Sequence, residues 1–237
     1  MGTTARPHGG EVTPESNRRR VPSIARVGQG AVLDHRRALY HPFENWLAVA
    51  DLHFGYELSA NAAGALYPGW GMEEVERHLG ALLHDYKPKT LIIAGDLVEN
   101  RAATLPALAL LKRLRAALAG AGAPFELVLI SGNHDRRCVE GSLLRDFFVT
   151  PSFCFYHGDR PEPDACGART SIVGHFHPAA TVRDRAGLHL KLPAFVQDGN
   201  LWTLPAFSPW TMGMEWYYPR AARLWLCGHG RVLPLKR

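Results

Sequence analysis

The sequence of 237 residues is poor in cysteine. Its four cysteines are Cys138, Cys154, Cys166 and Cys227, and no two of them have the Cys-X-X-Cys spacing. The chain therefore lacks the usual signature of a structural zinc site built from thiolates. Four cysteines are also too sparse for a disulfide framework in a chain of this length, so we expect all four to be free thiols.

Long apolar runs are missing as well. No uninterrupted apolar segment approaches the roughly 18 residues that span a bilayer. The three consecutive arginines at 18–20 are not followed by the apolar core of a secretory signal. We therefore expect a cytoplasmic protein with no membrane partner. With 46% hydrophobic and 21% charged residues, the composition is typical of one globular domain with a sizeable core.

Lysine is the third scarcity, with only 5 lysines among 27 basic residues. The net charge of +5 indicates either a polyanionic partner, such as nucleic acid, or only the arginine bias of a chain rich in Ala, Gly and Pro. Residues 1–22 are polar and show no apolar periodicity, so we expect a disordered basic tail followed by one domain at 23–237. The tail is either an electrostatic arm or a solvated terminus.

Up to about residue 146, predicted strands alternate with predicted helices. Apolar runs rich in β-branched residues lie at 46–50, 90–94 and 126–130. Between them, the spacing of apolar residues predicts helices over 72–86 and about 103–118. This alternation is typical of an α/β fold with a parallel sheet and crossover helices.

Shorter strand-like segments surround this unit. The segments 31–33 and 38–40 flank a polar turn and predict a hairpin. A stretch at 64–71 is rich in Gly and Pro and predicts a loop. In the C-terminal half we expect further strands rather than helices, at 153–156, 171–173, 201–204 and 224–226.

Polar side chains follow nearly every one of the predicted buried strands. They are Asp51 and His53, Asp96, Asn133 with His134 and Asp135, His157, and His175 with His177. Residues i and i+2 of an extended segment face the same side, so Asp51 with His53, and His175 with His177, can each present a pair to one cavity. A set of oxygen and imidazole ligands without thiolate suits Mn²⁺, Fe or Zn²⁺ in a hydrolytic centre with two metal ions.

The order and spacing of these motifs resembles the calcineurin-like metallophosphoesterase superfamily, from about Val32 to the C-terminus. Three stretches are similar to the DNA ligase-associated phosphoesterase group and its archaeal relatives: 50–57 (Ala-Asp-Leu-His-Phe-Gly-Tyr-Glu), Gly64 with Pro68, and 204–207 (Leu-Pro-Ala-Phe). Two stretches differ from the usual forms in that group, namely 97–100 (Leu-Val-Glu-Asn) and 208–210 (Ser-Pro-Trp).

The resemblance implies two packed mixed β-sheets flanked by helices, and it implies a role for each motif residue. One ion is held by Asp51, His53, Asp96 and His177, and the other by Asp96, Asn133, His157 and His175. The ions, Mn first and Fe or Zn as alternatives, activate a hydroxide that attacks phosphorus. In this scheme His134 stabilises the phosphoryl oxygens and protonates the leaving group, while Asp135 orients its ring. Arg136 either contacts the phosphate or forms a surface salt bridge.

The predicted function is therefore hydrolysis of a phosphate ester, a diester or a monoester, in a nucleotide or at a nucleic-acid end. The resemblance also implies a role in DNA repair and association with a DNA ligase or helicase. One alternative is a catalytically silent scaffold that binds protein partners, but such a scaffold should lack ligands. Another is a membrane-surface pyrophosphohydrolase of lipid precursors, which typically carries Arg at the position of His134.

Aromatic residues concentrate in the C-terminal half, as Trp202, Trp210, Trp216, Tyr217, Tyr218 and Trp225. Such residues can form a platform on which nucleic-acid bases stack. Packing in a core or on a sheet face is the commoner role of aromatics, and it is the role we expect. We assign no site function to the remaining histidines, and we interpret Asp159 and Asp198 as turn residues.

Overall fold

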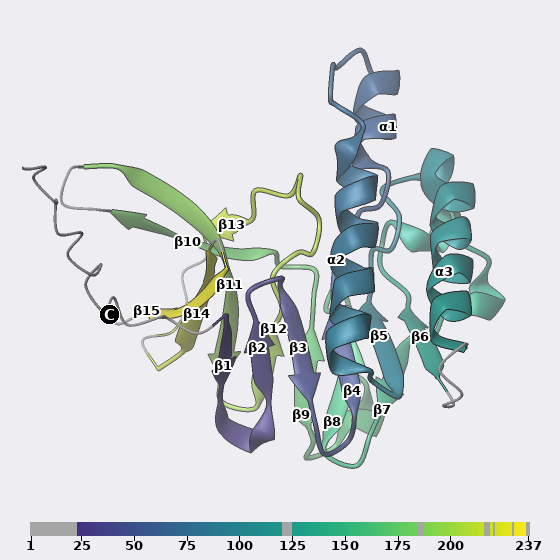
Figure 1. Ribbon diagram of the computed structural model, residues 1–237. Coiled ribbons are helices and arrows are strands. Elements are labelled where there is room, and N and C mark those ends of the chain that lie inside the picture. The colour runs from purple at the N-terminus through teal and green to yellow at the C-terminus, as the bar shows by residue number, and fades with distance from the viewer. Residues whose placement is uncertain are drawn as a thin grey trace, which may run out of the picture.

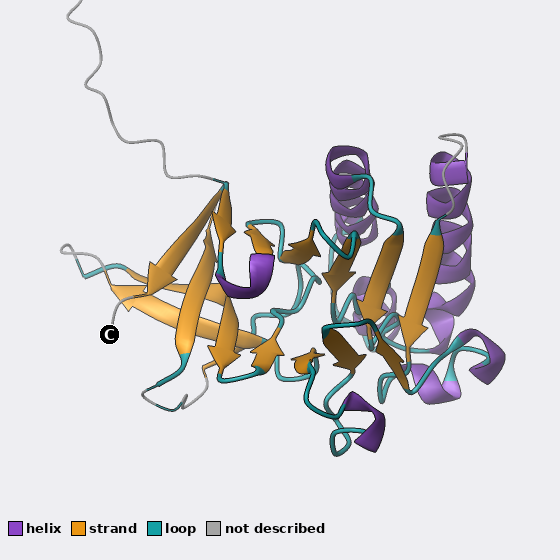
Figure 2. Ribbon diagram, turned by 90° about the horizontal axis from the view of Figure 1, so that it is seen from below, coloured by secondary structure: helices purple, strands orange, loops and turns teal. Residues whose placement is uncertain are grey.

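The computed structural model describes residues 23–119, 125–183, 187–215, 219, 221–228 and 230–235. The expected basic tail at 1–22 lies outside the described residues, as do His8, His229, Trp216, Tyr217 and Tyr218. Two mixed β-sheets pack against each other, and helices cover the outer face of the first sheet (Figure 1, Figure 2). The expected fold class is thereby confirmed.

The first sheet has six strands in chain order, β1-β2-β3-β4-β5-β6. The strands are β1 (Ile24–Arg26), β2 (Val32–Asp34), β3 (Ala38–His41), β4 (Trp46–Val49), β5 (Thr90–Ala94) and β6 (Glu126–Ile130). The first four pair antiparallel, which includes the predicted hairpin of β2 and β3, and the last three are parallel. Helices α2 (Trp70–Tyr86) and α3 (Thr104–Ala119) are the two predicted crossovers.

Alternation along the parallel strands explains how this sheet is covered on both faces. In β5, Leu91 and Ile93 pack with α2 and α3, whereas Ile92 and Ala94 point into the layer between the two sheets. Residues of opposite parity in a strand face opposite sides of the sheet. Since both faces are apolar, the sequence of β5 is a continuous apolar run, as expected for a buried parallel strand.

The second sheet has nine strands and is built from the C-terminal half of the described chain. They are β7 (Phe147–Val149), β8 (Phe153–Tyr156), β9 (Thr170–Val173), β10 (Pro178–Arg183), β11 (His189–Asp198), β12 (Leu201–Thr203), β13 (Met214–Glu215), β14 (Arg223–Gly228) and β15 (Arg231–Leu235). The prediction of a strand-rich second half is confirmed. The sequence analysis missed the long pair β10–β11. The first residues of β11 are exposed, and Pro193 lies inside the strand, where proline usually argues against a central strand.

Short helical elements occupy the connections. They are α1 (Tyr56–Ala62) and the 3₁₀ turns η1 (Gly28–Gly30), η2 (Arg101–Ala103), η3 (Asp135–Arg137), η4 (Gly141–Leu143) and η5 (Asp164–Cys166). Helix α1 was not predicted, and α2 begins at Trp70, inside the stretch expected to be a loop. Within the described residues, no helix is both long enough and apolar enough to cross a membrane.

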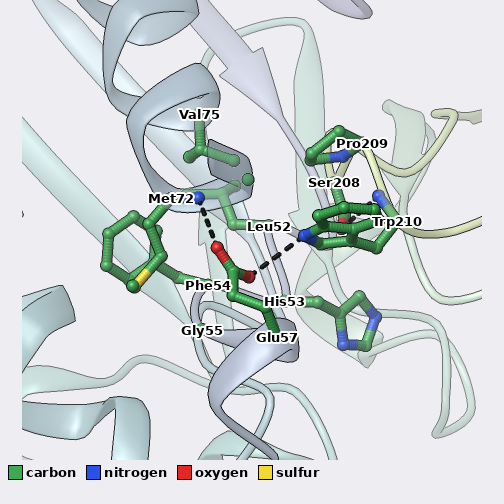
Figure 3. A pocket seen from close by; sticks show the side chains of 11 residues that line it. Leu52, His53, Phe54, Gly55, Glu57, Met72, Val75, Ser208, Pro209 and Trp210 are labelled. Atoms are coloured by element: carbon green, nitrogen blue, oxygen red, sulfur yellow. Dashed lines mark hydrogen bonds between the residues drawn. The ribbon is translucent and has the colours of Figure 1, made fainter. Parts of the chain in front are cut away.

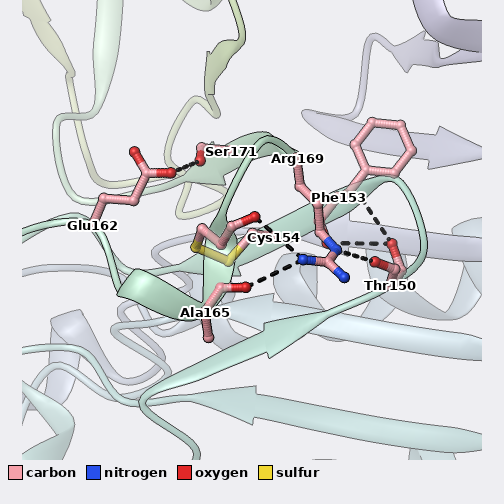
Figure 4. Close-up of a disulfide and its surroundings, with 8 residues drawn as sticks. Thr150, Phe153, Cys154, Glu162, Ala165, Arg169 and Ser171 are labelled. Atoms are coloured by element: carbon pink, nitrogen blue, oxygen red, sulfur yellow. Dashed lines mark hydrogen bonds between the residues drawn. A yellow bond between two sulfur atoms is a disulfide. The ribbon is translucent and has the colours of Figure 1, made fainter.

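The expectation of four free thiols is wrong for two of them, because Cys154 and Cys166 form a disulfide (Figure 4). Both side chains are fully buried, and η5 brings Cys166 to within 5.2 Å of Cys154, measured between Cα atoms. Arg169 fixes the turn by donating hydrogen bonds to the carbonyl oxygens of Ala165 and Thr150. Disulfides are uncommon in cytoplasmic proteins, and the cytoplasmic location stays a prediction.

Candidate metal centre

The polar motifs converge where the two sheets meet, at the carboxyl ends of β4, β5, β6, β8 and β9. Asp51 and His53 follow β4, Asp96 follows β5, and His157 follows β8. The edge formed by strand carboxyl ends is the usual place of active sites in α/β folds. The loop after β12 closes this edge, since the backbone N–H of Phe207 donates to the carbonyl oxygen of Ala50, at 2.8 Å.

Three groups of side chains could hold a metal ion, and they share members. In each group one ligand atom per residue lies within 4.8 Å of the others. The groups are Asp51, His53 and His177; His53, Asp96 and His134; and Asp96, His157 and His175. Because His53 and Asp96 each belong to two groups, the candidate ligands form one continuous row, with His53 towards one end and His157 towards the other.

Asp96 stands in the middle of this row. Its Oδ2 lies 3.4 Å from Nε2 of His157 and 3.9 Å from Nε2 of His53. Burial opposes ionisation of Asp96, but the hydrogen bond with His157 and the charge of that imidazole outweigh it and lower the pKa of Asp96 to about 2. The same pair raises the pKa of His157 to about 9, although burial alone would lower it. Asp96 is therefore an anion with ligand groups on both sides.

Asp51 contacts His175 and His177, the two histidines that follow β9. Its carboxylate accepts a hydrogen bond from the backbone N–H of His175, at 2.9 Å, and its Oδ2 lies 3.6 Å from Nε2 of His177. The Nε2 atoms of His177 and His53 are 3.3 Å apart. The side-chain oxygen of Asn133 lies 3.2 Å from Nε2 of His157, at the other end.

The ring nitrogens that face away from the row fix the imidazole tautomers. Nδ1 of His157 lies 3.1 Å from the carbonyl oxygen of Ala94, and that oxygen can only accept a hydrogen bond. Nδ1 therefore carries a proton, and in the neutral ring Nε2 offers its lone pair towards Asp96. Histidines that bind metals usually donate their second N–H in this way.

The backbone at the site is held in unusual conformations. Left-handed φ angles occur at five of the candidate ligands, which are Asp51 (53°), His53 (41°), Asp96 (47°), His175 (66°) and His177 (44°). Left-handed φ angles are uncommon outside glycine, and they cluster at functional sites, where the surrounding structure sustains the strain.

Gly132 is required by space. A Cβ added there would come within 2.1 Å of Oδ1 of Asp96. Only glycine therefore lets the loop after β6 approach the row closely enough to bring in Asn133 and His134. The backbone N–H of His134 donates to Oδ1 of Asp96, at 3.0 Å, and holds this carboxylate in place.

The structure disagrees with one predicted role. Asp135 does not orient the ring of His134, because its carboxylate accepts hydrogen bonds from the backbone N–H groups of Gly132 and Val98, both at 3.1 Å. Asp135 is completely buried and joins the loop after β6 to the loop after β5. Arg136 forms an ion pair with Asp159, the second of the two roles considered for it.

Comparison with known proteins agrees with this geometry. The family model of calcineurin-like phosphoesterases matches residues 46–231, which include every candidate ligand. The chain belongs to the calcineurin-like phosphoesterase family. A solved structure described as the Pseudomonas putida nuclease MPE is 33% identical, with a TM-score of 0.66 over 86% of this chain and 94% of that one. A search of the curated proteins finds no match.

As a member of that family, the chain is a metal-dependent phosphoester hydrolase. The donor set fits this assignment, since the row offers carboxylate oxygens and imidazole nitrogens, with the tautomer of His157 fixed, in a site where left-handed backbone and glycine bring them together.

Sequence reasoning missed Glu99. Its carboxylate lies 2.8 Å from Nδ1 of His53, and its backbone carbonyl oxygen accepts a hydrogen bond from Nδ1 of His134, also at 2.8 Å. Burial opposes ionisation of Glu99, but the hydrogen bond with His53 outweighs it and lowers the pKa of the carboxyl. Glu99 therefore orients two imidazoles of this phosphoesterase. One feature of the sequence could have indicated Glu99: it is an acidic residue three positions after Asp96, in the stretch 97–100 that differs from the DNA ligase-associated group.

Proposed function

We propose that this phosphoesterase hydrolyses phosphodiester bonds of nucleic acid with two divalent metal ions. The observation that carries the proposal is the pair of ligand groups that meet at Asp96. His53 lies on one side of this carboxylate and His157 on the other, so one residue can serve both ions. Nucleic acid as substrate is supported by the nuclease that shares 33% identity with this chain.

In this proposal Asp51, His53, Asp96 and His177 hold one ion, and Asp96, Asn133, His157 and His175 hold the other. We propose Mn²⁺ as the native ion, with Fe or Zn²⁺ as alternatives, because all three accept mixed oxygen and imidazole ligands. When bound, two such ions withdraw charge from the phosphoryl oxygens and make a water molecule acidic enough to attack at neutral pH.

His134 is the group that we propose for proton transfer. Its Nδ1 donates to the carbonyl oxygen of Glu99, so Nε2 is the nitrogen free to face the substrate, and it carries the proton to be transferred when the ring is an imidazolium. About a third of its side chain is exposed, against 6% for His53, so His134 is accessible to a substrate. A histidine in this place can protonate the oxygen of the departing nucleotide.

The test compares chelator-treated protein before and after addition of Mn²⁺, with a model phosphodiester and a model phosphomonoester. We expect turnover to return with the metal and to favour the diester, and metal analysis to give two ions per chain. Asp96→Ala should lose both ions together with activity. Asp198→Ala, at the exposed last residue of β11, is the matched control and should keep both.

Full turnover by Asp96→Ala would contradict the two-metal site. Normal metal content without hydrolysis of any phosphoester would instead favour the scaffold alternative. Association with a DNA ligase or helicase and a role in DNA repair stay predictions, which affinity capture with purified partners tests.

A further inference from the structure

We propose that four aromatic residues beside His53 form a stacking site for an unpaired nucleobase of the substrate strand. They are Tyr56, Tyr67, Trp70 and Trp210, called the aromatic cluster from here on. This inference rests on the proposed function, because it assumes a polynucleotide whose phosphate lies at the metal centre. It adds the requirement that the strand be single near the cleaved bond, since paired bases are already stacked on their neighbours.

The four rings form a continuous chain of contacts. Tyr56 and Tyr67 meet edge to face with centroids 5.4 Å apart, and Tyr67 meets Trp210 in the same way at 5.0 Å. Trp70 and Trp210 are 4.3 Å apart and inclined by 37°. Trp70 is 44% exposed and Tyr67 is 36% exposed, so both present uncovered ring surface to an incoming base.

Hydrogen bonds hold the cluster in place. Glu57, which is only 1% exposed, accepts a hydrogen bond from the indole N–H of Trp210 at 3.0 Å and another from the backbone N–H of Met72 at 2.8 Å (Figure 3). The side-chain amide of Asn61 bonds both the N–H and the carbonyl oxygen of Tyr67. A surface that is already ordered loses little entropy when it binds a ligand.

The cluster is continuous with the metal centre. Tyr56 follows His53 by three residues, and its backbone N–H donates to the carbonyl oxygen of His53 at 3.1 Å. On the other side, the N–H of Ser208 donates to the carbonyl oxygen of Asp51 at 3.2 Å, two residues before Trp210. The side chains of His53 and Trp210 line the same pocket (Figure 3).

The opposite end of the ligand row has a different character. A pocket of about 70 Å³ beside His157 is lined by Arg136, Arg160 and Asp159. Both arginines are paired with carboxylates, and Tyr156, the aromatic residue in its lining, is buried. Phe176, whose ring contacts His175, is only partly exposed. Of the aromatic residues named near the row, Tyr67 and Trp70 are the exposed ones; both belong to the cluster beside His53, and we place the base at that end.

Stacking places no requirement on the identity of the base. Every base has a flat π-face, so an aromatic site of this kind tolerates any sequence. The proposed ligand is therefore a single-stranded segment of any sequence, with one or two bases on Trp70 and Tyr67 and the adjacent phosphate among the candidate ligands.

The experiment compares two oligonucleotides of equal length with the Mn²⁺-loaded full chain, one of thymidines and one with abasic residues throughout. Binding is followed by fluorescence anisotropy and hydrolysis by steady-state kinetics. We expect the wild type to bind the thymidine strand more tightly. Trp70→Ala and Tyr67→Ala should each weaken that binding by about 5- to 150-fold, the range for loss of one stacked base, and leave binding of the abasic strand unchanged. Trp70→Phe should recover part of the loss.

Phe43→Ala is the matched control, because Phe43 is an aromatic residue that is 85% exposed and lies in the turn between β3 and β4. It should bind both strands like the wild type. Equal binding of the two strands by the wild type would overturn the stacking site, and so would an equal loss on both strands in Trp70→Ala. A wild-type dimer that dissociates on the substitution Trp70→Ala would overturn it too, by showing that the aromatic cluster binds a second copy of the chain.

These outcomes are separate from failure of the proposed function. If no diester is hydrolysed, the proposed function fails, while the anisotropy comparison still decides whether the cluster binds bases. If diesters are hydrolysed and the two strands bind alike, the proposed function stands and the stacking site fails.

Discussion

The role of Glu99 gives the sharpest prediction. Glu99→Gln keeps the size of the side chain and removes its charge, so Nδ1 of His53 loses the charged acceptor that lies 2.8 Å away. Glu99 is half-buried, and its backbone carbonyl contact with His134 does not depend on the side chain. The substitution therefore perturbs His53 while it leaves the position of His134 intact.

The expected magnitude follows from the position of Glu99 behind a candidate ligand. Loss of such a hydrogen-bond partner typically costs about 10- to 100-fold in metal affinity or activity. We expect Glu99→Gln to bind Mn²⁺ more weakly by this factor, equivalent to about 1.4 to 2.7 kcal/mol. Turnover at saturating Mn²⁺ should recover most of the wild-type value, because the ligands themselves are unchanged.

The assay is a Mn²⁺ titration of model diester hydrolysis, with calorimetric measurement of metal binding alongside. Glu44→Gln is the matched control. Glu44 also accepts hydrogen bonds, from the indole of Trp46 at 3.3 Å and from the backbone N–H of Ser152 at 3.0 Å, but it lies in the turn before β4, at the opposite end of that strand from the centre. Metal affinity that is the same in Glu99→Gln and in the wild type would refute the orienting role of Glu99.

Two further predictions concern packing and pH. Gly132→Ala places a methyl group 2.1 Å from the carboxylate of Asp96, so we expect loss of metal binding and a drop of about 1–3 kcal/mol in the free energy of unfolding. The control is Gly80→Ala in helix α2, where the added methyl group meets nothing within 4 Å and should not destabilise the protein. Equal behaviour of the two variants in metal titration and urea unfolding would contradict the steric argument. Burial opposes ionisation of Asp34, but hydrogen bonds from Arg36 outweigh it and lower the pKa of the carboxyl. A carboxyl whose pKa is lower in the folded than in the unfolded state stabilises the fold above its unfolded pKa, and that contribution is lost as the pH falls through the folded pKa. Asp34→Asn should therefore lower the urea midpoint at pH 7, and its difference from the wild type should shrink as the pH falls below about 4, the unfolded pKa of aspartate. A pH-independent difference would speak against it.

The parallel core of the fold was predictable in detail. Strands β5 and β6 begin and end at the residues that the apolar runs indicated. Such strands are covered on both faces, so their sequence is a continuous apolar run, which can be recognised without knowing which elements pack against the strand. Packing was also the right expectation for two of the aromatics, since Trp202 is fully buried and Trp225 stacks on it.

Features that depend on distant partners were not predictable. The disulfide of Cys154 and Cys166 needs η5 to fold back on β8. Helix α1 begins after Gly55, which has a left-handed φ of 77° and lies too close to Ala103 to carry a Cβ. The seven residues of helix α1 carry no local pattern that predicts this helix, because the contacts that stabilise it are made with residues elsewhere in the chain.

By itself, the sequence determined the chemistry available to this protein. Carboxylate, amide and imidazole groups placed after buried strands predicted a metal site, because the carboxyl ends of neighbouring parallel strands meet at one edge of a sheet. Only the tertiary structure decided how those groups are used. It places Glu99 behind His53, turns Asp135 towards backbone N–H groups, and brings Trp210 onto Trp70 beside the ligands. These contacts join residues from different loops, and the packing of two sheets fixes their distances in a way that no local pattern encodes.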